Sequence, residues 1–414
     1  MTNIAILGFG VVGSGTAEVL SRCNNRSNHR QNQNINLKYI VHRRDLPDSP
    51  YQDKIVKDFT IVEKDPDLHI VVETIGGTDA AYDMTKRALL AGKSVVTSNK
   101  ELVAVHGAEL LAIAKEKNCN YLFESAVGGG IPILRPLTTC LMGNNIQEIT
   151  GILNGTTNFI LSKMTGLDKI SYEDALKEAQ RLGFAEQDPS ADVEGKDACR
   201  KISILGNIAF GGTINPDTVP TEGITKVTLK DMAFLSYLFS SVKLVGRTFQ
   251  NDKGEIFAYV SPHVVSLRHP FKLVNDAFNM VEVTCDSLGK THFFGQGAGA
   301  LPTASAVVGD VLDLANDLHR DRNNGWKETP ITLADITTVP MDFYVRCHNQ
   351  NQEVKEKVTT KNYHFIDSCQ LSDEDFQDWG RDTSACIFKN ISRKELEENL
   401  QGLTVENIIP FLED

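Results

Sequence analysis

Short apolar runs alternate with amphipathic stretches along the first third of the chain. Each run has the length of a buried strand, and residues 80–91, which lie between two runs, have the pattern of a helix. The predicted strands are residues 4–7, 37–41, 70–74, 94–97 and 121–123. Strands that alternate with helices predict a parallel sheet, so the chain is expected to open with an α/β domain.

A glycine-rich turn follows the first of these strands. It reads Gly8-Phe9-Gly10-Val11-Val12-Gly13, which is G-x-G-x-x-G between a strand and a helix. The glycines permit a tight turn, close approach of the backbone to a pyrophosphate, and close packing of helix on strand. The helix start offers free N–H groups to phosphate. We therefore expect residues 1–137 to form a Rossmann dinucleotide-binding domain.

The ends of later strands carry further candidates for the cofactor site. Thr74 ends one strand, and Ser98 and Lys100 follow the next. Ligands of open α/β sheets bind beyond the carboxyl ends of the strands, so these residues are expected to meet cofactor or substrate. A second glycine-rich loop, which includes Gly297, precedes a long helix. This return of the chain predicts that residues 296–320 complete the domain.

The end of the second strand favours NADP(H) over NAD(H). An NAD site usually places Asp or Glu there to bind the ribose. This chain has His42-Arg43-Arg44 instead, and guanidinium groups suit a 2′-phosphate. We predict that Arg43 makes this contact, with Arg44 as the second choice. The alternative is a pair of solvated arginines on a loop.

Acids and bases are concentrated between residues 183 and 201. Glu186 and Asp192 lie in a predicted loop, and Asp197 and Lys201 lie four residues apart on the helix that follows, hence on one face. Apolar residues come next, so the helix is expected to carry Lys201 into a core. A lysine held beside carboxylates can donate and recover a proton. A salt-bridged helix start is the alternative interpretation.

Three consecutive glycines follow the strand that ends at residue 123. The segment Glu124–Pro132 predicts a tight turn rich in main-chain carbonyl groups. Such a turn can be purely structural, or it can hold a hard cation through backbone oxygens and one carboxylate.

Composition narrows the class of protein. The chain has 414 residues, enough for two or three domains, and a net charge of −12, which argues against a nucleic-acid-binding surface. No apolar run approaches a membrane span, and the first strand lies too close to Met1 for a signal peptide. The eight cysteines include no C-x-x-C pair, so reduced thiols and a cytoplasmic location are expected.

After residue 137 the regular alternation of strands and helices ends. Residues 138–295 are predicted to form an α/β substrate-binding and dimerisation domain. Residues 335–414 predict a small α+β domain with the order β-α-β-β-α-β. Its predicted elements are residues 341–347, 352–360, 363–368, 384–388, 393–400 and 408–412, with Ser392 as the cap of the second helix.

Seven motifs in order give the chain a family resemblance between residue 3 and about residue 320. They are GFGVVG, VETIGG, TSNKEL, ESAVGGGIP, GILNGTTNFIL, GFAEQDPSADVEGKDACRK and GQGAGALPTASAVV. Together they resemble homoserine dehydrogenase. This resemblance implies NAD(P)H-dependent, reversible reduction of L-aspartate 4-semialdehyde to L-homoserine, on the route to threonine, isoleucine and methionine. It also implies a homodimer, or a higher homo-oligomer, built on the sheet of the middle domain.

The resemblance also implies roles for individual residues. Lys201 matches the proton donor, Glu186 matches the homoserine ligand, and Lys100 matches a lysine beside nicotinamide and substrate. Asp192 and Asp197 match acids that line the same pocket. A monovalent-cation site, usually sodium and built mainly from main-chain carbonyls, matches Glu124, Val127, Gly129 and Ile131; the pyrophosphate loop matches Phe9, Gly10, Val11 and Val12.

The C-terminal segment resembles an ACT domain, which in this family is associated with feedback control by amino acids. Its first strand is followed by His348-Asn349-Gln350-Asn351 instead of the usual acidic, Pro-Gly turn. We therefore expect weak or absent inhibition by threonine. Two other functions remain as alternatives: another Rossmann dehydrogenase acting on an amino-acid-derived substrate, and a non-catalytic NADP(H)-sensing regulator.

Overall fold

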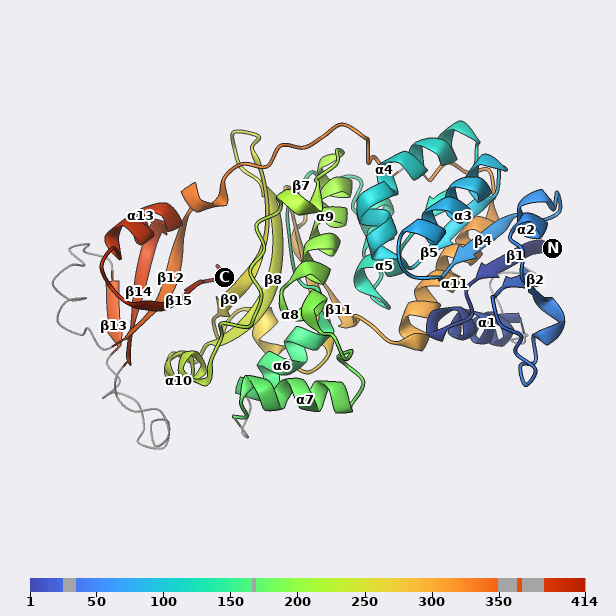
Figure 1. Cartoon of the computed structure of the whole chain (residues 1–414). Helices are drawn as coiled ribbons and strands as arrows, with labels where there is room; N and C mark the ends of the chain where they lie inside the picture. Colours follow the sequence, from blue (N-terminus) through green and yellow to red (C-terminus); the bar gives the residue numbers. More distant parts are fainter. Residues whose placement is uncertain (25–34, 166–168, 323, 349–362, 367–382, 414) are drawn as a thin grey trace. The chain divides into compact units, whose positions relative to one another are not determined.

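The structure, a computed structural model, describes residues 1–24, 35–165, 169–322, 324–348, 363–366 and 383–413 (Figure 1). The chain forms two compact units, each assembled from separate segments. Unit 1 comprises Met1–Ile149, Ser203–Thr218 and Val281–Thr332; unit 2 comprises Thr150–Ile202, Val219–Met280 and Leu333–Asp414. Among the described residues, no helix combines the length and apolar character that a membrane span requires.

A six-stranded parallel sheet is the centre of unit 1. Its order, β3-β2-β1-β4-β5-β6, is that of a doubly wound dinucleotide-binding fold, which confirms the predicted fold class. The strands are β1 (Thr2–Leu7), β2 (Ile35–Val41), β3 (Ile55–Val56), β4 (Ile70–Glu73), β5 (Ser94–Thr97) and β6 (Tyr121–Leu122).

Helices cover both faces of this sheet (Figure 1). On one face, Ile4 and Ile6 of β1 form a core with Ala17 of α1 and with Val307 and Val311 of α11. Helices α3 and α4 lie on the other face. The helices of this part are α1 (Val11–Asn24), α2 (Thr60–Lys64), α3 (Asp79–Leu90), α4 (Lys100–Glu116), α5 (Ser125–Gly128) and α11 (Ala300–Asn316). Thus a helix from late in the chain packs beside the first helix.

A five-stranded sheet has the order β11-β10-β7-β8-β9. Its strands are β7 (Ile146–Ile152), β8 (Ser241–Gln250), β9 (Ile256–Val265), β10 (Phe278–Cys285) and β11 (Gly289–Gln296). The helices between β7 and β8 are α6 (Gly155–Thr165), α7 (Tyr172–Arg181), α8 (Ser190–Val193), α9 (Lys196–Phe210) and α10 (Leu229–Tyr237). Ser171 caps α7, since its side chain accepts from the Asp174 N–H at 3.1 Å.

The C-terminal segment forms a small antiparallel sheet with the order β13-β14-β12-β15. Its elements are β12 (Pro340–His348), β13 (Tyr363–Ile366), β14 (Thr383–Ser392), α13 (Arg393–Asn399) and β15 (Val405–Pro410). Ser392 caps α13 as predicted, accepting from the Glu395 N–H at 3.2 Å. The helix predicted for residues 352–360 lies outside the described residues.

A buried ion pair joins this small sheet to α10 within unit 2. Arg346 of β12 donates to the Asp231 carboxylate at 2.7 and 3.3 Å, and both side chains are almost completely buried. Asn407 of β15 donates to the same carboxylate at 3.1 Å. Two strands of the C-terminal sheet are therefore bonded to one acidic side chain of the helix.

Removing the arginine should be costly because the buried Asp231 carboxylate would lose its cation. We expect Arg346→Met to lower the free energy of unfolding by about 3 kcal/mol or more, measured by urea denaturation. Arg393→Met is the matched control, since Arg393 pairs with the exposed Glu397 on α13 and should lose at most about 0.5 kcal/mol. Equal losses in the two variants would contradict the role of the buried pair.

Candidate active site

Two glycines of the first turn are required by close packing. Gly8 has φ +86°, and a Cβ there would lie 2.8 Å from the Thr74 carbonyl oxygen. A Cβ at Gly13 would lie 2.2 Å from the Gly8 carbonyl oxygen. Gly10 differs, because it is exposed and a Cβ would have no heavy atom within 4 Å. Space at Gly10 is thus left open, as expected where a ligand approaches the backbone.

The residues around this turn fit a pyrophosphate. Helix α1 begins at Val11, whose side chain is 71% exposed, so the helix N-terminus is uncovered in unit 1. Phe9 and Val12 pack on the core, and the Phe9 ring meets Tyr51 edge-on. The Thr74 hydroxyl donates to the carbonyls of Leu7 and Gly8 at 2.9 and 3.0 Å. Thr74 therefore fixes the turn.

Glu73 is a buried carboxylate that sequence reasoning did not single out. It accepts from the Thr97 hydroxyl at 2.5 Å and from the Ile75 N–H at 2.6 Å, so it links the ends of β4 and β5. Burial raises the pKa of this carboxyl above its ordinary value. The sequence did not indicate this role, because a short strand that is buried on both faces has no alternation of polar and apolar residues that would mark Glu73.

The two arginines after β2 are accessible to a ligand. Arg43 and Arg44 are exposed in the bend that follows β2. Among the described residues neither forms an ion pair, whereas the next acid, Asp45, pairs with Lys57 at 3.1 Å. No acidic side chain of the described chain neutralises these two guanidinium groups.

Ser98 and Lys100 flank a fixed asparagine at the end of β5. Asn99 caps α4 by accepting from the Leu102 N–H at 3.1 Å, and its amide donates to the Gly77 carbonyl at 2.6 Å. Lys100 is therefore the first residue of α4, and it is partly buried. This amide therefore joins the loop after β4 to the loop after β5.

The predicted tight turn after β6 is present at the three glycines, where the Ile131 N–H donates to the Gly128 carbonyl at 2.9 Å, but it begins later than Glu124. Residues 125–128 form the short helix α5, and the chain reverses only at Gly129, which has φ +58°. A Cβ at Gly129 would lie 2.3 Å from the Gly297 carbonyl oxygen, so glycine is required for this approach. Val127 lies in α5 and Ile131 is buried just after the reversal.

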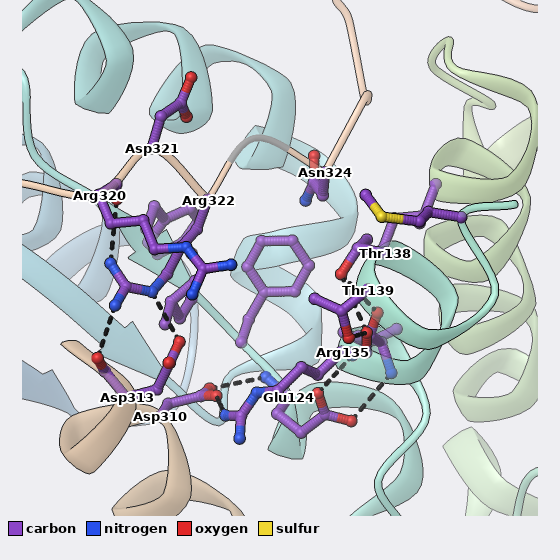
Figure 2. Close-up of a pocket in the computed structure, with 16 residues that line it drawn as sticks. Glu124, Arg135, Thr138, Thr139, Asp310, Asp313, Arg320, Asp321, Arg322 and Asn324 are labelled. Atoms are coloured by element: carbon purple, nitrogen blue, oxygen red, sulfur yellow. Dashed lines mark hydrogen bonds and ion pairs between the residues drawn. The ribbon is translucent and has the colours of Figure 1, made fainter. Parts of the chain in front are cut away.

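The Glu124 carboxylate holds the backbone that follows this reversal. It accepts from the N–H groups of Ile133, Leu134 and Arg135 at 2.5, 2.9 and 2.7 Å. Asp310 of α11 accepts from the Glu124 N–H at 3.0 Å and pairs with the Arg135 guanidinium at 2.5 Å. Figure 2 shows this network at one side of a cavity of about 480 Å³.

This network decides how the predicted cation site can be built. Burial, aided by the nearby Glu124 charge, raises the pKa of Asp310 to about 7, while Arg135 opposes the rise. Glu124 Oε1 accepts two backbone N–H groups and Oε2 accepts one, so this carboxylate serves mainly to hold the loop. Main-chain oxygens of the segment would therefore have to supply most of the ligands of a hard cation such as sodium.

In unit 2, Lys201 lies inside a compact polar cluster. Its ammonium donates to the Leu153 carbonyl at 2.7 Å and to the Asp197 carboxylate at 2.8 Å. The side chains of Lys201 and Asp197 are only 10% and 2% exposed. Both residues are on α9 at i and i+4, as predicted, and the apolar residues after them bury the pair.

Asn154, which sequence reasoning missed, connects this pair to a second acid. Its amide nitrogen donates to Asp192 at 2.6 Å and to Asp197 at 2.8 Å. The signal was present in the sequence, since an asparagine directly before a helix start is a preferred N-cap. The structure therefore brings Asp192, Asp197 and Lys201 together around one amide.

Glu186 is placed differently from the other three predicted groups. It is exposed in the loop between α7 and α8, where its carbonyl oxygen accepts from the Gln180 amide at 3.1 Å. Within the described chain its carboxylate makes no hydrogen bond to the Lys201 cluster. The remaining candidates, which include Lys100 and the glycine loop, belong to unit 1.

These features define a class of protein: a nucleotide-dependent oxidoreductase with a Rossmann domain and a buried lysine–carboxylate cluster. Residues 8–124 match the family model described as "Homoserine dehydrogenase, NAD binding domain", and residues 132–312 match the model described as "Homoserine dehydrogenase". The chain therefore belongs to the homoserine dehydrogenase family, whose reaction is the NAD(P)H-dependent, reversible reduction of L-aspartate 4-semialdehyde to L-homoserine.

Individual relatives agree with this assignment. Homoserine dehydrogenase of Bacillus subtilis is 39% identical over 319 residues, which cover 76% of this chain and 73% of the relative. The crystal structure of a homoserine dehydrogenase from Thiobacillus denitrificans has a TM-score of 0.87 at 31% identity, with 100% and 98% of the two chains covered. A hyperthermophilic archaeal homoserine dehydrogenase in complex with NADPH has a TM-score of 0.64 at 30% identity, covering 76% and 97%.

The glycine loop offers a paired test. We expect Gly13→Ala to destabilise the apo protein by roughly 1–3 kcal/mol, because the new methyl group would overlap the Gly8 carbonyl. Gly10→Ala should leave the thermal midpoint unchanged, because its methyl group meets no other atom of the protein. It should weaken NADPH binding in a fluorescence titration, because the methyl group would occupy the space at the helix start that the pyrophosphate needs. Full NADPH affinity in Gly10→Ala would contradict the phosphate-binding role of the loop.

Proposed function

We propose that Lys201 transfers the proton in the homoserine dehydrogenase reaction of this chain. The observation that carries the proposal is the position of its ammonium, 2.7 Å from the Leu153 carbonyl oxygen and 2.8 Å from Asp197 in an almost fully buried site. An ammonium held in this way has one orientation. It can stabilise an oxygen that becomes negative and then give it a proton.

The chemistry needs a positive group at the substrate oxygen. The reduced nicotinamide, when bound, supplies the hydride that reaches the aldehyde carbon. The electron pair of the C=O bond then moves to oxygen, and the proton from Lys201 completes the hydroxyl group. In the reverse direction the neutral amine of Lys201 accepts that proton. Asp197 keeps the lysine in place through both protonation states.

The substrate itself carries an ammonium and a carboxylate. We propose that the exposed carboxylate of Glu186 binds the ammonium and that Asp192 lines the same pocket. Lys100, at the start of α4, is proposed to act beside nicotinamide and substrate. These three roles rest on the motif matches, and Glu186 is accessible for its role.

We further propose NADPH as the preferred cofactor. Arg43 and Arg44 are exposed after β2, and among the described residues neither is paired with a carboxylate, since the adjacent Asp45 pairs with Lys57; both observations support this preference. The archaeal neighbour whose structure contains NADPH provides independent support. We also propose a bound sodium ion. Its ligands would be main-chain oxygens of Glu124, Val127, Gly129 and Ile131, with no carboxylate ligand.

The remaining proposals concern assembly and control. Membership of the family favours a homodimer in the cytoplasm. It also favours a role in the synthesis of threonine, methionine and isoleucine. The order of the C-terminal sheet agrees with a β-α-β-β-α-β domain of the ACT type. The turn on which an effector site would depend, residues 349–351, lies outside the described residues. We propose that this domain lacks strong threonine control.

The first test is Lys201→Ala. We expect kcat for reduction of aspartate semialdehyde to fall roughly 10²–10⁴-fold, the usual effect of losing a general acid. NADPH affinity should not change. Lys196→Ala is the matched control, because Lys196 lies on the same helix in an exposed pair with Glu194. Equal losses of NADPH binding and turnover in Lys201→Ala would mark Lys201 as a structural residue.

The second test concerns the 2′-phosphate. We expect Arg43→Ala to raise KM for NADPH about 10- to 100-fold, which corresponds to a lost charged hydrogen bond of ~1.5–3 kcal/mol. KM for NADH should stay the same. Arg44→Ala serves as the comparison, and a larger effect there would move the contact by one residue. Similar losses with both cofactors in both variants would rule out the assignment.

A further inference from the structure

We infer that Asn154 is a positioning residue whose side-chain amide fixes Asp192, Asp197 and Lys201 in the arrangement that proton transfer needs. The inference rests on the proposed role of Lys201 and extends it to a residue outside the acidic and basic motif. Asn154 lies in the turn between β7 and α6, more than 35 positions before the residues that it contacts.

The amide nitrogen of Asn154 has two hydrogens, and each is donated to a different carboxylate. Asp192 on α8 accepts one at 2.6 Å, and Asp197 on α9 accepts the other at 2.8 Å. The same Asp197 oxygen accepts from the Lys201 ammonium at 2.8 Å. The amide therefore stands between two acids that would otherwise repel each other, and it donates one hydrogen bond to each.

The orientation of this amide is fixed by the helix that follows it. Its carbonyl oxygen accepts from the Thr157 N–H at 2.8 Å and from the Thr157 hydroxyl at 2.9 Å. A backbone N–H can only donate, so a flipped amide would place N–H against N–H. The flip would also point the oxygen at two carboxylates. Only the orientation that donates to Asp192 and Asp197 satisfies every group.

The residue before Asn154, Leu153, binds Lys201 from the same turn. Leu153 supplies the carbonyl that accepts from Lys201 at 2.7 Å, and Asn154 follows it directly. Two consecutive residues of one buried turn thus hold the ammonium and its carboxylate partner, since Leu153 is 1% and Asn154 is 5% exposed. A small displacement of this turn would move Lys201 and Asp197 together.

Asn154 also caps α6, so a purely structural role must be separated from positioning. Serine and aspartate are both good N-cap residues. Asn154→Ser keeps a cap acceptor but has a side chain too short to bridge two acids. Asn154→Asp keeps the shape and the cap, and replaces the bridging NH₂ by oxygen. A cap-only role predicts that both variants are as active as the wild type.

The experiment measures kcat for reduction of aspartate semialdehyde, its pH profile, NADPH affinity and the thermal midpoint. For Asn154→Ser we expect a thermal midpoint close to that of the wild type, unchanged NADPH affinity, and a fall in kcat on the order of 10²-fold, the cost of a misplaced catalytic group. For Asn154→Asp, added negative charge beside Lys201 favours the protonated lysine. The alkaline limb of its kcat profile should therefore move to higher pH.

Asn207→Ser is the matched control, because Asn207 is a buried asparagine of α9 that accepts a backbone N–H from Ile214 at 2.7 Å. Its pH profile should be that of the wild type. Wild-type kcat and pH profile in both Asn154 variants would overturn the inference, even with Lys201→Ala inactive. If the wild type itself failed to reduce aspartate semialdehyde, the proposed function would fall instead. Should Asn154→Ser not fold, kcat of the isosteric Asn154→Asp decides, because a cap-only role predicts wild-type kcat and loss of the bridge to the two acids predicts a fall.

Discussion

A buried ammonium must be surrounded by oxygen, and this requirement organises the part of unit 2 around Lys201. Lys201 is 8% exposed on a helix whose next residues are apolar, so it needs acceptors that do not come from solvent. Asp197 supplies one from the same helix, and the Leu153 carbonyl supplies another from the end of β7. The turn before α6 must therefore lie against α9. The arrangement leaves a positive group held in a buried site, which is also what a developing alkoxide requires.

Unit 1 depends on a different constraint, the absence of side chains where backbone meets backbone. Gly8 and Gly13 allow β1, α1 and the end of β4 to approach, and Gly129 allows the segment after β6 to approach the loop before α11. Buried carboxylates then hold the loops at the ends of these strands through hydrogen bonds. Glu73 links two strand ends, and Glu124 accepts three consecutive N–H groups. Such fixed loops suit a nucleotide, because a rigid backbone loses little freedom when the ligand binds.

The C-terminal sheet is bonded to α10 and β9 of unit 2 and is not a loosely attached module. The buried Arg346–Asp231 pair joins β12 to α10, and the Leu412 N–H donates to the Val264 carbonyl of β9 at 2.9 Å. Leu412 also belongs to a core cluster with Val265 and Phe271. Homologous archaeal structures cover 76% of this chain. In this chain, however, removal of the sheet would leave a buried carboxylate without its cation.

The sequence by itself determined the features that repeat locally. Strand and helix periodicity predicted the parallel sheet, the glycine spacing predicted the nucleotide turn, and the i,i+4 spacing placed Asp197 and Lys201 on one helix face. It predicted neither the amide of Asn154 between Asp192 and Asp197 nor the use of the Glu124 carboxylate for backbone N–H groups. It also missed the pairing of Arg346 with Asp231, 115 positions away. Periodicity records which face of an element is buried, whereas the partner of a buried polar group is chosen when distant elements pack, because only then must each donor find an acceptor.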